Sequence, residues 1–195
     1  RQPNAAAEVA QSVALAWQLR RNPEEAAQVY QQLTGAFFLN DELQQFAKAR
    51  IRRLELVGNP APALGQADLK QQEFNWSDYS NRVVVIDFWA TNCRPCLEEL
   101  PRLRRRAAEF GQQGVDLVGV SFDEDAATVE QFMSLEPIPW RVVLDRPTAE
   151  SEYHVELIPC LMIVDRQGNI LATDVPPPDL SAALETALSA DAASQ

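Results

Sequence analysis

The stretch that decides the fold is VVVIDFWATNCRPCLEELPRL, residues 83–103. Its first seven residues, 83–89, are mostly β-branched or aromatic, which predicts a buried strand. Residues 94–111 carry a helical pattern that ends at Gly111. Cys93 and Cys96 lie between the two elements, so two of the chain's 3 cysteines occupy one strand-to-helix junction.

That junction favours redox chemistry at the cysteine pair. Cys93 is expected at the helix N-terminus, where free N–H groups and the helix dipole stabilise an anion. A thiolate is the nucleophilic form of cysteine, so this position activates Cys93. Cys96 follows one turn later and is expected to be more shielded. Pro95 suits the first turn of a helix, and Arg94 adds a cation beside the thiolate.

A zinc site is the alternative for the same pair. Structural zinc takes four Cys or His ligands, and the chain offers four: Cys93, Cys96, Cys160 and His154. Their spacing is poor for such a site, since the pair lies at a strand-to-helix junction rather than on a knuckle. The redox interpretation is therefore preferred.

The rest of the C-terminal part alternates between strand and helix patterns. Strands are expected at 115–122, 140–145, 161–165 and 170–175, and helices at 123–135, 147–155 and 178–190. The last two strands flank RQGN and form a predicted hairpin. Such alternation predicts a mixed α/β sheet covered on both faces.

Residues 4–57 instead predict three helices in a small antiparallel bundle. GNPAPALG, residues 58–65, follows as a Pro/Gly-rich linker. The formal charge of −11 is uneven, since residues 1–64 carry about +1 and residues 65–195 carry −12. We therefore divide the chain into a helical extension, 1–57, and a second domain, 58–195, that is expected to fold without it. The extension is either a packed appendage or a module for a protein partner.

Residues 57–190 resemble the extracytoplasmic TlpA/ResA-like thiol–disulfide oxidoreductases, which have the thioredoxin fold. The phrases VGNPAPAL, WSDYSNRVVVIDFWATNC, DLVGVSFDED and LIPCLMIVDRQGNIL carry the resemblance. It implies a thioredoxin-like three-layer α/β/α fold with a mixed central sheet. The helical region before it is not covered.

The resemblance also implies roles around the dithiol. Cys93 would attack a substrate disulfide and Cys96 would resolve the mixed disulfide. Pro159 matches the cis-proline that packs across the disulfide, so Ile158 would offer its backbone to a substrate strand. Trp89 matches an aromatic residue beside the active site.

Two carboxyl groups and a second proline are implied as well. Asp87 falls where thioredoxin has a buried acid, and Glu99 matches an acid near the dithiol of ResA-like proteins. A buried carboxylate with a raised pKa could move a proton to or from Cys96. Pro101 matches the proline that kinks the helix after the dithiol.

The sequence also departs from the family. Asn92 stands where tryptophan is usual, and residues 115–122 contain no lysine to partner Asp87. The pair Arg94-Pro95 lies between the cysteines, at positions that help to set the redox potential. Cys160 follows the expected cis-proline and is predicted to be a buried, unreactive thiol that alternation turns away from the dithiol.

These observations predict an enzyme that exchanges electrons with protein disulfides, acting as a reductase, with an upstream electron donor. No organic cofactor and no metal are expected, because the Cys93–Cys96 couple carries the electrons. The negative charge disfavours nucleic acid as a partner. No membrane span is visible. We expect a bacterial, extracytoplasmic location, either periplasmic or tethered by a removed N-terminal segment. The alternatives are a thiol peroxidase related to peroxiredoxins, or a copper-binding or scaffold protein on the same fold.

Overall fold

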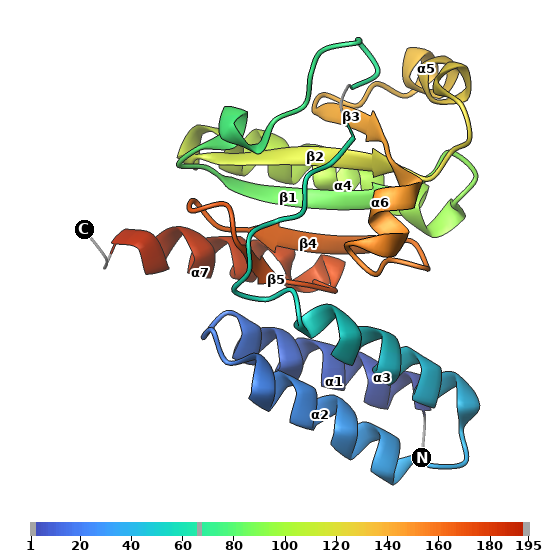
Figure 1. Cartoon of the computed structure of the whole chain (residues 1–195), viewed down its shortest axis with the longest axis vertical. Coiled ribbons are helices and arrows are strands. Elements are labelled where there is room, and N and C mark those ends of the chain that lie inside the picture. The colour runs from blue at the N-terminus through green and yellow to red at the C-terminus, as the bar shows by residue number, and fades with distance from the viewer. Residues whose placement is uncertain (1–2, 66–67, 193–195) are drawn as a thin grey trace.

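The computed structural model describes residues 3–65 and 68–192 and contains a central five-stranded sheet (Figure 1). The strand order is β3-β2-β1-β4-β5. The three strands on one side are parallel, whereas the last two are antiparallel to their neighbours. The expected mixed sheet is confirmed. Its strands are β1 (Val83–Trp89), β2 (Val115–Ser121), β3 (Arg141–Leu144), β4 (Cys160–Val164) and β5 (Ile170–Ala172).

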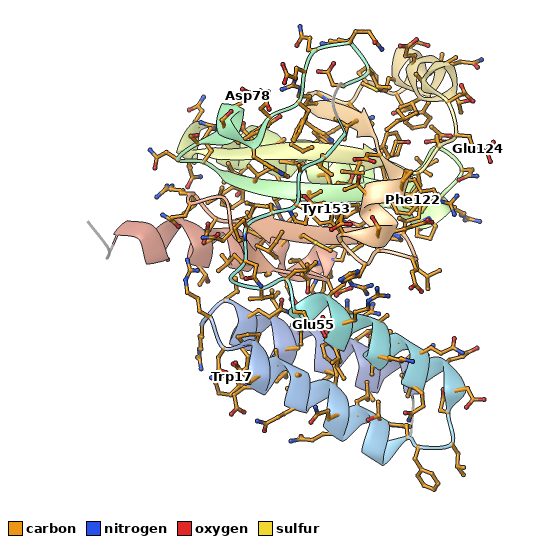
Figure 2. All side chains as sticks on the ribbon, in the orientation of Figure 1. Trp17, Glu55, Asp78, Phe122, Glu124 and Tyr153 are labelled. Carbon is orange, nitrogen blue, oxygen red and sulfur yellow. A yellow bond between two sulfur atoms is a disulfide. The ribbon has the colours of Figure 1, made fainter. Side chains whose placement is uncertain are left out.

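Helices cover both faces of this sheet, which confirms the three layers. On one face, α4 and α7 bury Leu103 and Leu184 against Val83 and Val85 of β1. On the other, α6 precedes Tyr153, which is fully buried (Figure 2) and whose hydroxyl donates to the Pro62 carbonyl at 2.6 Å. Figure 1 shows α4 behind the sheet and α6 in front of it. The helices of this region are α4 (Arg94–Phe110), α5 (Ala126–Leu135), α6 (Arg146–Ser151) and α7 (Leu180–Ala192).

Several predicted boundaries are wrong by a few residues, and side-chain caps explain two of them. The acidic run after β2 does not enter the helix, because the Asp125 carboxylate accepts from the Thr128 N–H at 2.8 Å and starts α5 at residue 126. Asp145 caps α6 in the same way, through the Thr148 N–H at 3.2 Å. The last strand ends at Ala172 rather than at 175.

The N-terminal region forms the three predicted helices. They are α1 (Pro3–Gln18), α2 (Pro23–Ala36) and α3 (Asp41–Leu54), and they lie side by side beneath the β4–β5 edge of the sheet (Figure 1). Asn22 and Asn40 cap the second and third helices by accepting from backbone N–H groups three residues on.

This helical layer shares a hydrophobic core with the sheet. A continuous group of buried side chains runs from Tyr30 and Leu54 to Val84 and Met162. Polar contacts tie the layer to the segment after β5, since the Gln18 side chain accepts from the Thr173 N–H at 2.8 Å. The division of the chain at residue 57 stays a prediction.

Within the described residues, none of the helices has both the length and the apolar character that a membrane crossing requires.

Candidate active site

The two cysteines at the start of α4 are joined by a disulfide bond with an S–S distance of 2.02 Å. Cys93 is the N-cap residue of the helix, and its Sγ accepts from the Cys96 N–H at 3.3 Å. Cys93 is partly exposed, whereas Cys96 is buried, with 3% of its surface accessible. The predicted division into an accessible sulfur at the helix end and a shielded sulfur inside it is confirmed.

The loop that presents Cys93 is held by residues that the sequence analysis missed. The Asp123 carboxylate accepts from the Thr91 N–H at 3.0 Å and from the Thr91 hydroxyl at 2.6 Å. Ser121 also donates to Asp123, at 2.7 Å. The available signal was the position of Asp123 just past the end of β2, since parallel neighbouring strands end at the same edge of a sheet.

Arg94 and Pro95 are exposed in the first turn of α4, beside Asn92. The Arg94 Nε donates to Glu98 at 3.0 Å, and both side chains are well exposed. The expected cation, Arg94, is therefore present beside Cys93, but its positive charge is partly neutralised by the Glu98 carboxylate.

The loop before β4 carries the expected proline. The Ile158–Pro159 bond is cis, as the sequence analysis predicted. Ile158 and Cys93 pack against the same two groups of buried side chains, which places this loop beside the dithiol.

Trp89 belongs to the buried cluster that contains Cys96, and none of its surface is exposed. Trp89 therefore lies beside the dithiol, as the resemblance implied, but it packs in the interior and offers no exposed surface to a substrate. A Cβ added to Gly119 would lie 3.0 Å from its Nε1, so the indole occupies the space that a larger residue on β2 would need.

Asp87 lies on β1, in register with Gly119. Within the described part of the chain, its carboxyl group makes no hydrogen bond or ion pair. Burial, and then the nearby charge of Glu99, raise the pKa of Asp87 to about 7. Asp87 and Glu99, the two acids that the resemblance indicated, therefore interact electrostatically.

Glu99 lies on α4, and 18% of its side chain is exposed. Its Oε1 pairs with Arg102, whereas its Oε2 is buried without a hydrogen-bond partner among the described residues. Glu99 also lines a cavity of about 280 Å³ between α4 and the Pro177–Pro178 segment. It can therefore connect buried Asp87 with water. Pro101 lies inside the same helix, as expected.

Cys160 is buried at the start of β4, as predicted, with its Sγ 4.0 Å from the Asp174 carboxylate. Burial, followed by the charge of Asp174, raises the pKa of the Cys160 thiol to about 12. It stays protonated at neutral pH, so it does not act as a nucleophile there.

The four ligands of the zinc alternative do not converge. In the part of the chain that the structure describes, no three His, Cys, Asp or Glu side chains are grouped to hold a metal ion.

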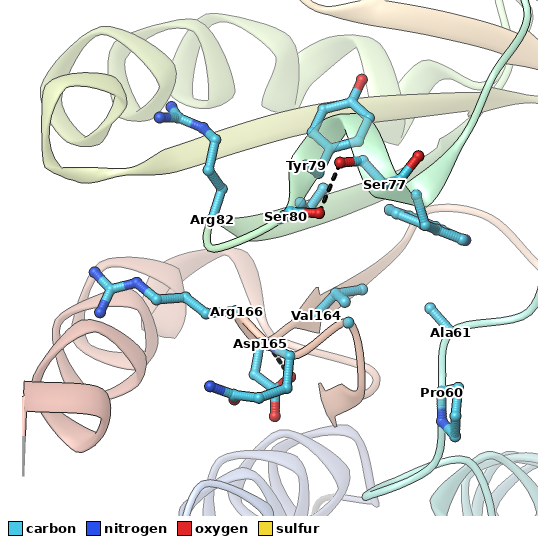
Figure 3. Close-up of a pocket in the computed structure, with 13 residues that line it drawn as sticks. Pro60, Ala61, Ser77, Tyr79, Ser80, Arg82, Val164, Asp165 and Arg166 are labelled. Atoms are coloured by element: carbon cyan, nitrogen blue, oxygen red, sulfur yellow. Dashed lines mark hydrogen bonds between the residues drawn. The ribbon is translucent and has the colours of Figure 1, made fainter. Parts of the chain in front are cut away.

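A different cavity, of about 300 Å³, lies at the opposite end of the sheet, between Tyr79, Arg82 and the turn that follows β4 (Figure 3). Its Arg82 side chain is bound to Asp116 on β2. The dithiol follows the other end of β1, so this cavity is not part of the site.

Comparison with known proteins covers the sheet domain and its site. Residues 57–173 match the model of the AhpC/TSA family. The chain is 31% identical over 115 residues to the thiol-disulfide oxidoreductase ResA of Geobacillus kaustophilus, a match that spans 58% of this chain but only 66% of that protein's length.

Solved structures agree with the predicted fold. The thioredoxin domain of a thiol-disulfide oxidoreductase from Bacteroides vulgatus is 27% identical, with a TM-score of 0.60 over 66% of this chain and 94% of that one. A thiol:disulfide interchange protein from Bacteroides sp. is 26% identical, with a TM-score of 0.60 over 68% and 90%. The thioredoxin-like fold is therefore confirmed for the sheet domain.

Proposed function

The chain belongs to the AhpC/TSA family, and from this membership we propose that it is a thiol–disulfide oxidoreductase that acts on protein disulfides. One observation carries the proposal: a disulfide joins Cys93, which caps a helix at the surface, to Cys96, which is buried one turn later. That arrangement separates an attacking sulfur from a resolving one.

The proposed reaction is a two-electron exchange in two steps. In the reduced protein, the Cys93 thiolate attacks one sulfur of a substrate disulfide. The substrate S–S bond breaks, one substrate thiolate leaves, and a mixed disulfide forms at Cys93. The Cys96 thiolate then attacks the Cys93 sulfur and releases the second substrate thiolate. The substrate gains two electrons, and the Cys93–Cys96 bond of the present structure re-forms.

The second step requires Cys96 to lose a proton. We assign this proton to the buried carboxylate of Asp87, whose pKa of about 7 suits exchange near neutral pH. Glu99 would pass the proton on to water, since it is coupled to Asp87 and lines an open cavity. In this scheme the proton passes from Cys96 to Asp87 and then to Glu99 on α4, so no lysine beside Asp87 is needed.

The partners follow from the chemistry. A dithiol donor must return two electrons to Cys93–Cys96 after each turnover, and the couple needs no organic cofactor. We propose an extracytoplasmic location in a bacterium, in line with the resemblance to ResA. The N-terminal helices are a candidate contact for a protein partner.

The test uses the full chain, reduced beforehand and freed of reductant. Mixing it with a disulfide-containing protein should release two substrate thiols for each Cys93–Cys96 disulfide formed. The Cys93→Ser variant should release none. If the wild-type chain transfers no electrons to protein disulfides, the proposal is rejected.

The same sample separates the alternatives. A thiol peroxidase would consume hydrogen peroxide in preference to protein disulfides, and a copper site would take up copper after reduction with loss of free thiols. The site favours neither alternative, because its two cysteines, Cys93 and Cys96, are joined to each other in a disulfide.

A further inference from the structure

A groove of about 510 Å³ lies between α3 and the loop that carries the cis-proline. One wall is helical and includes Phe46, Ala49 and Arg50, and the other includes Leu157, Ile158 and Pro159. The helical wall lies outside residues 57–173, so it is a feature that the family match does not cover.

The loop wall can accept an extended chain. Among the residues described, neither Leu157 nor Ile158 makes a backbone hydrogen bond. The Leu157 side chain is 83% exposed, which is unusual for so large an apolar residue. Unpaired backbone groups beside an exposed apolar side chain are what an added strand uses for binding.

The helical wall supplies an apolar surface. The Arg50 guanidinium lies 3.4 Å from the centroid of the Phe46 ring and donates to the Phe46 carbonyl at 3.3 Å. The Arg50 Nε is buried and lies 3.9 Å from the nearest Asp174 oxygen. These contacts hold Arg50 against its own chain, so Phe46 and Ala49 provide the apolar part of this wall.

The groove also borders the loop that packs near the proposed reaction site. Ile158 belongs to its wall and packs against the same buried clusters as Cys93. A segment lying in the groove would thus pass along this loop, near a cysteine held at Cys93. The chain's charge of −11, with Glu42 and Glu156 also lining the groove, favours an apolar rather than an acidic segment.

We propose that α3 forms one wall of the substrate groove, which takes an extended apolar segment next to the reacting cysteine of a protein disulfide. This inference rests on the proposed function and adds the substrate class to it. An apolar side chain of the segment would lie against Phe46 and Leu157.

A bulky substitution in the groove provides the test. Ala49→Tyr fills the helical wall, whereas Lys48→Tyr places the same side chain on an exposed position of α3 outside the groove. Two disulfides serve as substrates for the reduced proteins. One is a ten-residue peptide with an apolar residue beside its cysteine, in disulfide linkage to mercaptoethanol, and the other is hydroxyethyl disulfide.

We expect Ala49→Tyr to lower the rate with the peptide roughly tenfold, as a loss of binding energy would, and to leave the rate with hydroxyethyl disulfide unchanged. Lys48→Tyr should match the wild type on both. Equal rates for Ala49→Tyr and the wild type on the peptide would overturn the groove assignment. So would an equal loss on both substrates, because the substitution would then act on the dithiol.

Calorimetric titration separates this inference from the proposed function. The probe is the same peptide with serine in place of cysteine, which cannot react. Binding that Ala49→Tyr abolishes supports the groove even if no disulfide is reduced. Activity on both disulfides without any binding of the probe, and without selective loss in Ala49→Tyr, rejects the groove and leaves the proposed function standing.

Discussion

Asp87 departs from the ordinary behaviour of a carboxyl group. It lies in the interior without a hydrogen-bond partner among the described residues, where its ionisation costs free energy. The coupled charge of Glu99 adds to that penalty. An apolar or amide side chain would make the strand more stable, so its presence points to a use in proton transfer.

Replacing Asp87 with Asn is expected to stabilise the protein at high pH only. Below about pH 4 the carboxyl is protonated in both the folded and the unfolded chain, so it contributes no pH dependence. As the pH rises from about 4 to 7, the unfolded chain ionises first and the folded state loses stability; above pH 7 the penalty is complete. The gain in unfolding free energy for Asp87→Asn should reach on the order of 4 kcal/mol at pH 8.

Urea denaturation at pH 4, 6 and 8 measures this gain. Glu98→Gln is the control, because Glu98 is an exposed carboxyl on the neighbouring helix. A gain for Asp87→Asn that is the same at all three pH values would mean that the carboxyl is ionised normally in the folded protein.

The two sulfurs should also differ in their adducts. In Cys96→Ser, substrate attached to Cys93 cannot be released, so a mixed disulfide should accumulate. In Cys93→Ser the two remaining thiols, Cys96 and Cys160, are buried, so few adducts should form. Mass spectrometry after incubation with a disulfide-containing protein identifies the cysteine that carries the partner. Adducts mainly on Cys96 would reverse the two roles.

At the scale of elements, local signals predicted more than long-range ones. The helix start at Cys93 and the buried strand β1 follow from residues close together in the chain. The cis-proline and the three-layer arrangement with a mixed sheet followed from the family resemblance. The Arg53–Asp174 pair could not be predicted, because it joins segments whose approach depends on the whole fold. The contact between Asp123 and Thr91 was missed although the position of Asp123, just past the end of β2, was a signal for it. The buried position of Trp89 followed from the strand pattern of residues 83–89, whereas the resemblance implied only that this residue lies beside the active site.

The Arg53–Asp174 pair is expected to hold α3 against the sheet. Arg53→Met would leave the buried Asp174 carboxylate with only two longer contacts among the described residues, Arg50 at 3.9 Å and the Cys160 thiol at 4.0 Å. This change should lower the unfolding free energy by about 3–5 kcal/mol. Adding Asp174→Asn should recover most of the loss; asparagine tolerates the left-handed backbone at this position, where φ is 54°.

Arg52→Met is the matched control, measured in the same urea titrations. Its ion pair with Glu156 is exposed, at 3.7 Å, and should contribute about 1 kcal/mol or less. A loss in Arg53→Met no greater than in Arg52→Met would show that the buried pair does not hold the helix.

At the scale of the whole molecule, the shared core changes what a truncation should do. The Pro/Gly linker predicted a domain that folds without the helices. In the structure, helices within residues 3–57 cover apolar side chains of the sheet and the charge of Asp174. Removing them would expose both surfaces at once.

A chain lacking residues 1–57 is therefore expected to melt well below the full chain and to associate as its concentration rises. Differential scanning calorimetry and light scattering measure the two effects. A fragment that melts at the temperature of the full chain as a monomer would restore the view that the helices are a separable appendage.

The burial of Trp89 in the same cluster as Cys96 has an optical consequence. A disulfide close to an excited indole quenches its emission, whereas a pair of thiols quenches it less. The fluorescence of this chain should therefore brighten when the Cys93–Cys96 bond is reduced and dim when it re-forms. Intrinsic tryptophan fluorescence would thus report the redox state of the Cys93–Cys96 pair at each turnover, in unlabelled protein.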